Sequence, residues 1–194
     1  LNNLTDITTR PEYASLCGYT HDDIKTSFKA HLVDVDLDML KQLYNGYDYL
    51  GGEENKVYNP YDILLFIDNG CEYKNYWWGT GNPSFLIEKL QEQNYYIPKL
   101  ENIIVSEEIL DSFDIEHIDL IALLWQTGYL TFANKVQTYD ESYDYHLKVP
   151  NREIQKSLNM LFLNFLTNQP IKVLSNQKLI YHDLTQDIAQ LEHT

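Results

Sequence analysis

The sequence has few of the residues on which several common kinds of protein depend. Its two cysteines, Cys17 and Cys71, do not form a Cys-x-x-Cys pair, which excludes a metal cluster built on cysteine alone and favours a reduced, cytoplasmic setting. No apolar run approaches the length of about 18 residues that a membrane-spanning helix needs, and no basic segment followed by an apolar one opens the chain. We therefore expect a soluble protein with no membrane partner.

Basic residues are also scarce. The chain has 14 lysines and arginines against 29 aspartates and glutamates, which gives a formal net charge of −15. A nucleic-acid-binding surface needs clustered basic side chains to displace counterions from phosphates. The charge balance therefore disfavours nucleic acid as a partner of this segment.

The sequence patterns of common catalytic sites are missing as well. The histidines are scattered and form no His-Glu-x-x-His pair, and no serine lies in a Gly-x-Ser-x-Gly context. The chain also contains no Gly-x-x-x-x-Gly-Lys-Ser/Thr loop. We therefore assign no catalytic residue and no metal ligand.

Helix-capping signals are frequent in the first third of the chain. Thr9 precedes Pro11 in a short helical pattern that ends at Gly18. Thr20 with Asp23 three residues later forms a capping-box pattern, Asp36 precedes a third amphipathic segment, and the Asn59-Pro60 pair predicts the start of another helix. Between them, Tyr47 to Leu50 and Lys56 to Tyr58 flank a Gly-Gly turn and predict a small hairpin.

The second half alternates between helical and strand-like patterns. A short β-like run precedes a helix capped by Ser106, and a second helix follows in "DIEHIDLIALLWQTG". The segments "YLTFA" and "SYDYHLKV" predict a two-stranded wing, and "REIQKSLNMLFLNFL" predicts a closing helix. We predict a mainly α fold with small β-hairpins: a helical subdomain with one hairpin at 1–97, a winged-helix-like subdomain at 98–167, and a linker or tail at 168–194 that leads toward a further domain.

The stretch "YWWGTGNPSFLIEKL" raises two interpretations. Asn82 and Pro83 can start a helix, in the same way as Asn59 and Pro60. The exposed backbone amides of Gly79, Thr80 and Gly81 could also hold an anion at that helix start. Helix capping is a sufficient explanation of the pattern, and ligand contact remains the alternative.

Five ordered segments resemble one family. The segments "LNNLTDITTRPEYASLCGYT", "YNGYDY", "KVYNPYDILLFI", "YWWGTGNPSFLIEKL" and "IDLIALLWQTGYLTF" are similar to those of bacterial and archaeal AAA-ATPase-like proteins, over about residues 1 to 166. Members of that family often carry a C-terminal PD-(D/E)XK nuclease-like domain. The resemblance implies that the P-loop core, with its ATP and Mg, precedes this segment and that the nuclease-like domain follows it. The start at Leu1 likewise suggests a piece of a longer protein.

The resemblance further implies that this chain is the helical lid plus the winged-helix-like part of such an ATPase. A lid covers the nucleotide and moves as its phosphates change, so it relays the nucleotide state to a downstream domain or partner. The candidate nucleotide contacts are Arg10 and the turn Gly79, Thr80, Gly81 and Asn82. By itself the segment is expected to hold no cofactor and to catalyse nothing, and its partners are expected to be the ATPase core and a C-terminal domain of the same protein.

Two other functions remain open. The chain could be a stand-alone protein-interaction module, with Trp77, Trp78 and Trp125 as interface candidates. It could also be a winged-helix protein that binds nucleic acid, although the helix expected to enter the groove, "DLIALLWQTG", carries no lysine or arginine.

Overall fold

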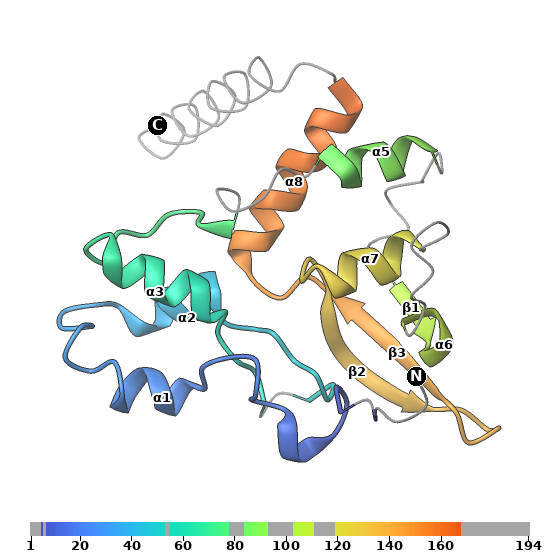
Figure 1. Cartoon of the computed structure of the whole chain (residues 1–194), viewed down its shortest axis with the longest axis horizontal. Coiled ribbons are helices and arrows are strands. Elements are labelled where there is room, and N and C mark those ends of the chain that lie inside the picture. Colours follow the sequence, from blue (N-terminus) through green and yellow to red (C-terminus); the bar gives the residue numbers. More distant parts are fainter. Residues whose placement is uncertain are drawn as a thin grey trace, which may run out of the picture.

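The computed structural model describes residues 5, 7–52, 55–77, 84–92, 103–110 and 119–167. Figure 1 shows α1, α2 and α3 grouped on one side, the β-sheet with α6 and α7 on the other, and α8 rising between them toward α5. The expected boundary at residues 97 and 98 and the tail at 168–194 lie outside the described residues.

The local capping signals of the N-terminal part are confirmed. Helix α1 (His21–Thr26) begins with the Thr20–Asp23 capping box, and helix α2 (Leu37–Tyr44) begins where Asp36 accepts the Asp38 and Met39 amides. Helix α3 (Pro60–Asp68) begins at the Asn59 cap. The expected first helix is reduced to a 3-10 turn, η1 (Pro11–Tyr13), followed by further turns.

The hairpin expected at Tyr47–Leu50 and Lys56–Tyr58 does not form two regular strands. Its only described ladder pair is one isolated antiparallel bridge between Tyr47 and Val57, whereas Tyr58 pairs with Tyr19. The reason is local: the Asp48 carboxylate accepts the backbone amides of Leu50, Gly51 and Gly52, at 2.8 to 2.9 Å, so the chain turns immediately after Asp48.

The expectation of a mainly α fold is wrong, because the protein has a mixed α/β fold. Strands β1 (Ile103–Ser106), β2 (Thr131–Gln137) and β3 (Tyr143–Lys148) form a three-stranded antiparallel sheet in the order β1-β3-β2. The predicted β2–β3 hairpin is present, but β1 joins it through a pairing between segments distant in sequence, and β2 extends beyond the predicted segment "YLTFA" to Gln137. Long-range strand pairing leaves no local pattern in a single sequence, which explains the miss.

Helices cover this sheet and link it to the N-terminal group. Helix α6 (Glu107–Leu110) follows β1 directly, and α7 (Leu120–Gln126) begins at the Asp119 cap. Helix α8 (Arg152–Thr167) contacts α2 of the N-terminal group and, farther along, α5 (Ser84–Glu92) (Figure 1).

The buried apolar side chains form two clusters. One lies among α1, α2 and α3 and is centred on Ile24, Tyr44 and Phe66. The larger one surrounds the sheet, and it also includes Tyr47 and Val57 from the N-terminal part of the chain. The segment that follows α2 therefore contributes to the core of the sheet.

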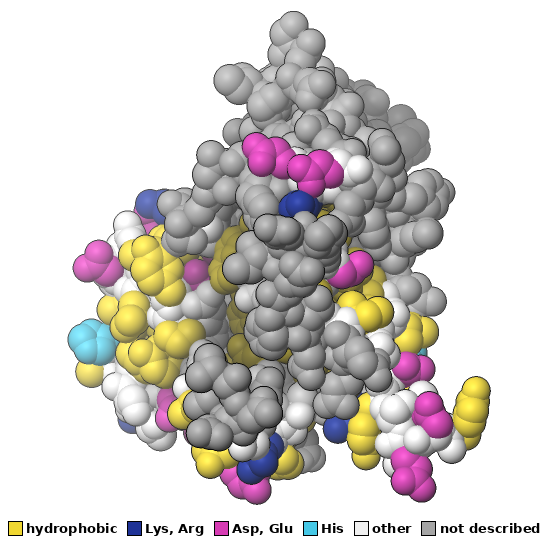
Figure 2. Space-filling view, turned by 45° about the vertical axis from the view of Figure 1, so that its right-hand side comes forward, with side chains coloured by type: hydrophobic (Ala, Val, Ile, Leu, Met, Phe, Trp, Pro, Cys, Tyr) yellow, Lys and Arg dark blue, Asp and Glu magenta, His cyan; other side chains and the backbone are white. Residues whose placement is uncertain are grey.

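The surface fits the acidic composition. On the face shown in Figure 2, Asp and Glu side chains are spread over the described surface, and Lys and Arg side chains stand singly among them. None of the described helices is both long and apolar enough to cross a membrane.

Candidate functional site

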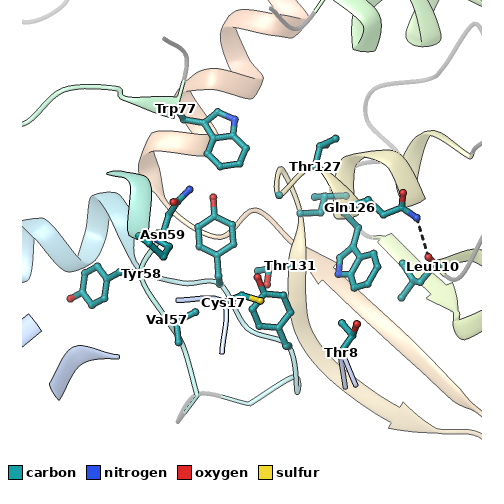
Figure 3. Close-up of a pocket in the computed structure, with 16 residues that line it drawn as sticks. Thr8, Cys17, Val57, Tyr58, Asn59, Trp77, Leu110, Gln126, Thr127 and Thr131 are labelled. Carbon is teal, nitrogen blue, oxygen red and sulfur yellow. Dashed lines mark hydrogen bonds between the residues drawn. The ribbon is translucent and has the colours of Figure 1, made fainter. Parts of the chain in front are cut away.

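A cavity of about 440 Å³ lies where the N-terminal helical group meets the sheet. Its walls come from all five of the segments that carry the family resemblance, which places residues far apart in sequence around one space (Figure 3). The lining residues are Thr8, Cys17, Tyr47, Tyr49, Val57, Tyr58, Asn59, Pro60, Trp77, Leu110, Trp125, Gln126, Thr127, Gly128, Leu130 and Thr131.

The described lining of this cavity is aromatic and polar but uncharged. It includes tyrosine and tryptophan rings together with hydroxyl and amide groups, and no Lys, Arg, Asp, Glu or His among its described residues. Small-molecule sites are typically of this kind, with apolar walls and a few polar groups that fix orientation. The chemistry suits a flat, neutral molecule rather than a phosphate chain.

Trp77 forms one wall and is held on several sides. Its ring lies against Tyr129 in an edge-to-face arrangement, with centroids 5.7 Å apart, and is tilted against Tyr47 at 6.4 Å. Gly128 allows the close approach of this ring, because a Cβ at that position would lie 2.8 Å from the tip of the indole. In Figure 3 Trp77 stands at the top of the space, opposite Cys17 and Thr8.

The opposite wall depends on Trp125 and on the start of β2. Trp125 stacks on Phe132, with ring centroids 5.5 Å apart. The Thr131 hydroxyl accepts the Asp48 backbone amide at 2.7 Å and donates to the Asp48 carbonyl at 2.8 Å, and both residues are buried. These two buried hydrogen bonds fix the loop after Tyr47 against the sheet.

A pair of buried carboxyl groups lies behind the Tyr47 and Trp77 walls. Asp62 of α3 is 0% exposed and Glu153 of α8 is 1% exposed. The Glu153 Oε1 atom accepts the backbone amides of Tyr76, at 2.5 Å, and Trp77, at 3.0 Å. Burial, followed by the charge of Glu153, raises the pKa of Asp62 to about 8, and burial raises the pKa of Glu153. One proton is therefore shared by the pair near neutral pH.

Tyr47 links the cavity to the buried acid pair, since it lines the cavity and interacts with the charge of Asp62. Burial raises the pKa of its hydroxyl well above the ordinary value. Asn59 lies beside this hydroxyl, but the two do not meet in hydrogen-bond geometry, and the hydroxyl has no hydrogen-bond partner among the described residues. A buried, unpaired hydroxyl is a group that a ligand could satisfy.

The predicted site residues fall in different places. Arg10 is exposed and lies two positions after Thr8, a lining residue. Gly79, Thr80, Gly81 and Asn82 lie outside the described residues. The role of Arg10 and that of the turn both stay predictions. Of the interface candidates, Trp77 and Trp125 both line the cavity, and Trp78 lies outside the described part of the chain.

The sequence analysis missed the buried acids. Asp62 had a detectable signal, because it lies in "NPYDILLF" on the helix face that also buries Ile63 and Phe66. An acid on an apolar face needs a partner or a proton. Nothing local indicates that this partner is Glu153, which follows an arginine on a helix far along the chain.

Comparison with known proteins gives one informative match. The chain is 36% identical over 181 residues, or 93% of its length, to the "Uncharacterized protein in vnfD 5'region" of Azotobacter chroococcum mcd 1. It covers 34% of that protein, so it spans about a third of the length of the curated relative that it matches. No family model matches the chain, and no solved structure matches it.

Proposed function

We propose that this chain is the non-catalytic part of a longer AAA-ATPase-like protein, in which it covers the bound nucleotide and relays its state to a downstream domain or to a partner protein. The observation that carries this proposal is the convergence of the resembling segments. All five contribute walls to one cavity: "LNNLTDITTRPEYASLCGYT", "YNGYDY", "KVYNPYDI", the start of "YWWGTG", and "LLWQTGYLTF". The similarity to a relative about three times as long is consistent with a function that needs further segments.

The cavity lining suits the base of a nucleotide. Aromatic rings such as Trp77 and Trp125 can stack on a purine, and the Asn59 amide and Tyr47 hydroxyl can bond to its polar edge. ATP and Mg in the longer protein would still need other residues for their charges. No group of three or more His, Cys, Asp or Glu in the described part of this chain could hold a metal ion. We therefore assign the triphosphate and its Mg to the ATPase core.

The joints around the cavity suit a unit that moves as one body. Thr131 and Asp48 bond across buried backbone, and Glu153 of α8 holds the turn at Tyr76 and Trp77. A rigid unit that covers a ligand transmits its displacement to whatever is attached to it. The ATPase core and a C-terminal domain are the proposed partners, and the free Cys17 and Cys71 agree with a cytoplasmic location.

Calorimetric titration of the purified 194-residue chain tests the ligand. Adenosine has about 19 non-hydrogen atoms, and about 0.3 kcal/mol per atom gives a dissociation constant on the order of 0.1 mM. We expect adenosine and ATP to bind within a few-fold of each other, because the described cavity walls carry no charge, and inorganic triphosphate not to compete. Preferential binding of triphosphate, or Mg-dependent ATP turnover by this chain alone, would contradict the proposal.

Exposed Cys17 allows a matched pair of variants. Cys17→Trp places a bulky ring in the cavity and should abolish adenosine binding. Leu16→Trp adds the same ring at the neighbouring position, which is 67% exposed and does not line the cavity, and should leave the affinity unchanged. Equal affinities for the two variants would place the ligand elsewhere.

A protein-interaction module is the second candidate, and the partly buried Trp77 and Trp125 at the cavity support it. It predicts that cross-linking and sedimentation detect a partner-dependent complex while adenosine does not bind. A nucleic-acid binder is disfavoured by the net charge of −15, and binding at low salt that weakens steeply as salt is added would revive it.

A further inference from the structure

The buried acids Asp62 and Glu153 lie at the point where three parts of the chain meet. Asp62 lies on α3, Glu153 lies on α8, and the turn at Tyr76 and Trp77 bonds to Glu153. This turn leads directly into the cavity wall formed by Trp77. The protonation state of the pair therefore bears on the position of that wall.

One proton improves the hydrogen bonding of the pair, because it gives one Asp62 oxygen and the Glu153 Oε2 atom a partner. With both carboxyls ionised, both Asp62 oxygens and the Glu153 Oε2 atom have no donor within the described residues. A proton on Asp62 turns its carboxyl into a donor to the Glu153 carboxylate, while Glu153 Oε1 keeps the two backbone amides. Two adjacent buried negative charges without a cation would be strongly unfavourable.

The neighbouring titratable groups do not neutralise a second charge. Tyr44 of α2, Tyr47 of the loop after α2 and Tyr76 of the turn all interact with the pair, and burial raises the pKa of each hydroxyl. These phenols stay neutral across the physiological range. In the part of the chain that the structure describes, no Lys, Arg or His contributes to the field at either carboxyl.

We propose that Asp62 and Glu153 form a one-proton clasp that joins α3, α8 and the Tyr76–Trp77 turn, and that loss of the proton loosens the clasp and releases Trp77 from the cavity wall. The proton leaves Asp62 for solvent, and the carboxylate of Asp62 on α3 then repels that of Glu153 on α8. Cavity shape thereby becomes sensitive to pH. This inference is independent of which ligand the cavity holds.

Unfolding at different pH values tests the clasp. An aspartate in the unfolded chain titrates near 3.9, whereas Asp62 in the folded protein titrates at about 8, so between these values the folded state holds the extra proton. The contribution to stability is present at low pH and is lost as pH rises to about 8. We expect the unfolding constant from urea denaturation to rise about tenfold per pH unit between pH 5.5 and 7.5 relative to Asp62→Asn.

Asp62→Asn keeps a donor to Glu153 at every pH, and Asp68→Asn changes an exposed aspartate of the same helix as the control. The unfolding constants of the wild type and Asp68→Asn should rise with pH in the same way, relative to that of Asp62→Asn. The Trp emission of both proteins should shift to the red between pH 7 and 9. Trp77→Phe should lose this shift. The proposal would be overturned if the ratio of the unfolding constants of the wild type and Asp62→Asn did not change with pH. The same red shift of the Trp emission in Asp62→Asn would also overturn it.

Infrared spectroscopy of the wild type decides the matter if Asp62→Asn does not fold. A carbonyl stretch of a protonated carboxylic acid should be present at pH 7 and should disappear above pH 9. Its absence at pH 7 would show that both carboxyls are ionised, and the clasp would be refuted.

Discussion

Replacing Gly46 by alanine should weaken the contact between the end of α2 and the start of α8. Gly46 follows α2 with a φ of +118°, a conformation that L side chains rarely adopt. An added Cβ would also lie 2.0 Å from the Pro150 carbonyl oxygen, which belongs to backbone and has little freedom to move away. Backbone strain of about 1–3 kcal/mol and overpacking of about 1–3 kcal/mol predict a loss of roughly 2–6 kcal/mol in the free energy of unfolding.

Other glycines of the chain separate these two effects. Gly70 has a φ of +68° but open space where its Cβ would lie, so Gly70→Ala should cost only the strain, about 1–2 kcal/mol. Gly18 has no such φ, but its Cβ would lie 2.3 Å from a Val57 methyl carbon and 2.8 Å from the Tyr58 carbonyl oxygen, so Gly18→Ala should cost about 1–3 kcal/mol from overpacking alone. Gly52→Ala meets neither problem and should stay within about 0.5 kcal/mol of the wild type.

Urea denaturation of the four variants at one pH measures these differences. The predicted order of destabilisation is Gly46→Ala first, Gly18→Ala and Gly70→Ala between, and Gly52→Ala last. A Gly46→Ala protein as stable as Gly52→Ala would refute the close approach of Gly46 to the Pro150 backbone.

Three further substitutions probe the cavity walls and the caps. Thr131→Val leaves the buried Asp48 amide without its partner, although the Asp48 carbonyl keeps the Phe132 amide, and should cost about 1–3 kcal/mol in urea denaturation. A cost under about 0.5 kcal/mol would remove this pair of hydrogen bonds from the account. Asp36→Ala removes the α2 cap and should lower the free energy of unfolding by about 1 kcal/mol, and unchanged stability would argue against the cap. Tyr47→Phe deletes a buried hydroxyl without a bonded partner among the described residues, so thermal denaturation should show an unchanged or higher melting temperature; a marked decrease would mean that the hydroxyl is satisfied.

Local signals in the sequence predicted the parts of the fold that depend on local interactions. Thr20 with Asp23, and Asp36, act within one helical turn of themselves, and the structure confirms both caps. The pairing of Ile103–Ser106 with β3 depends on segments about 40 residues apart, and the four residues of that strand carry no information about their partner. The fold class was wrong for that reason.

The candidate site was predictable in outline only. Trp77 and Trp125 were identified as interface candidates because they are large aromatic residues, and both line the cavity. The position of Trp77 in the wall depends on Gly128, whose missing side chain admits the Trp77 ring, and on a hydrogen bond from the Trp77 amide to a distant glutamate. The Asp62–Glu153 pair forms only when the fold brings residues of α3 and α8 together, so a single sequence showed an acid on an apolar face but not its partner.

Photolabelling of the 194-residue chain with 8-azidoadenosine triphosphate tests the central claim most directly, because the reactive group is on the base. We predict that the label attaches to Tyr47, Trp77 or Trp125, and that adenosine suppresses labelling whereas inorganic triphosphate does not. Labelling outside the cavity, or suppression by inorganic triphosphate but not by adenosine, would contradict the claim that this unit covers the base of a nucleotide.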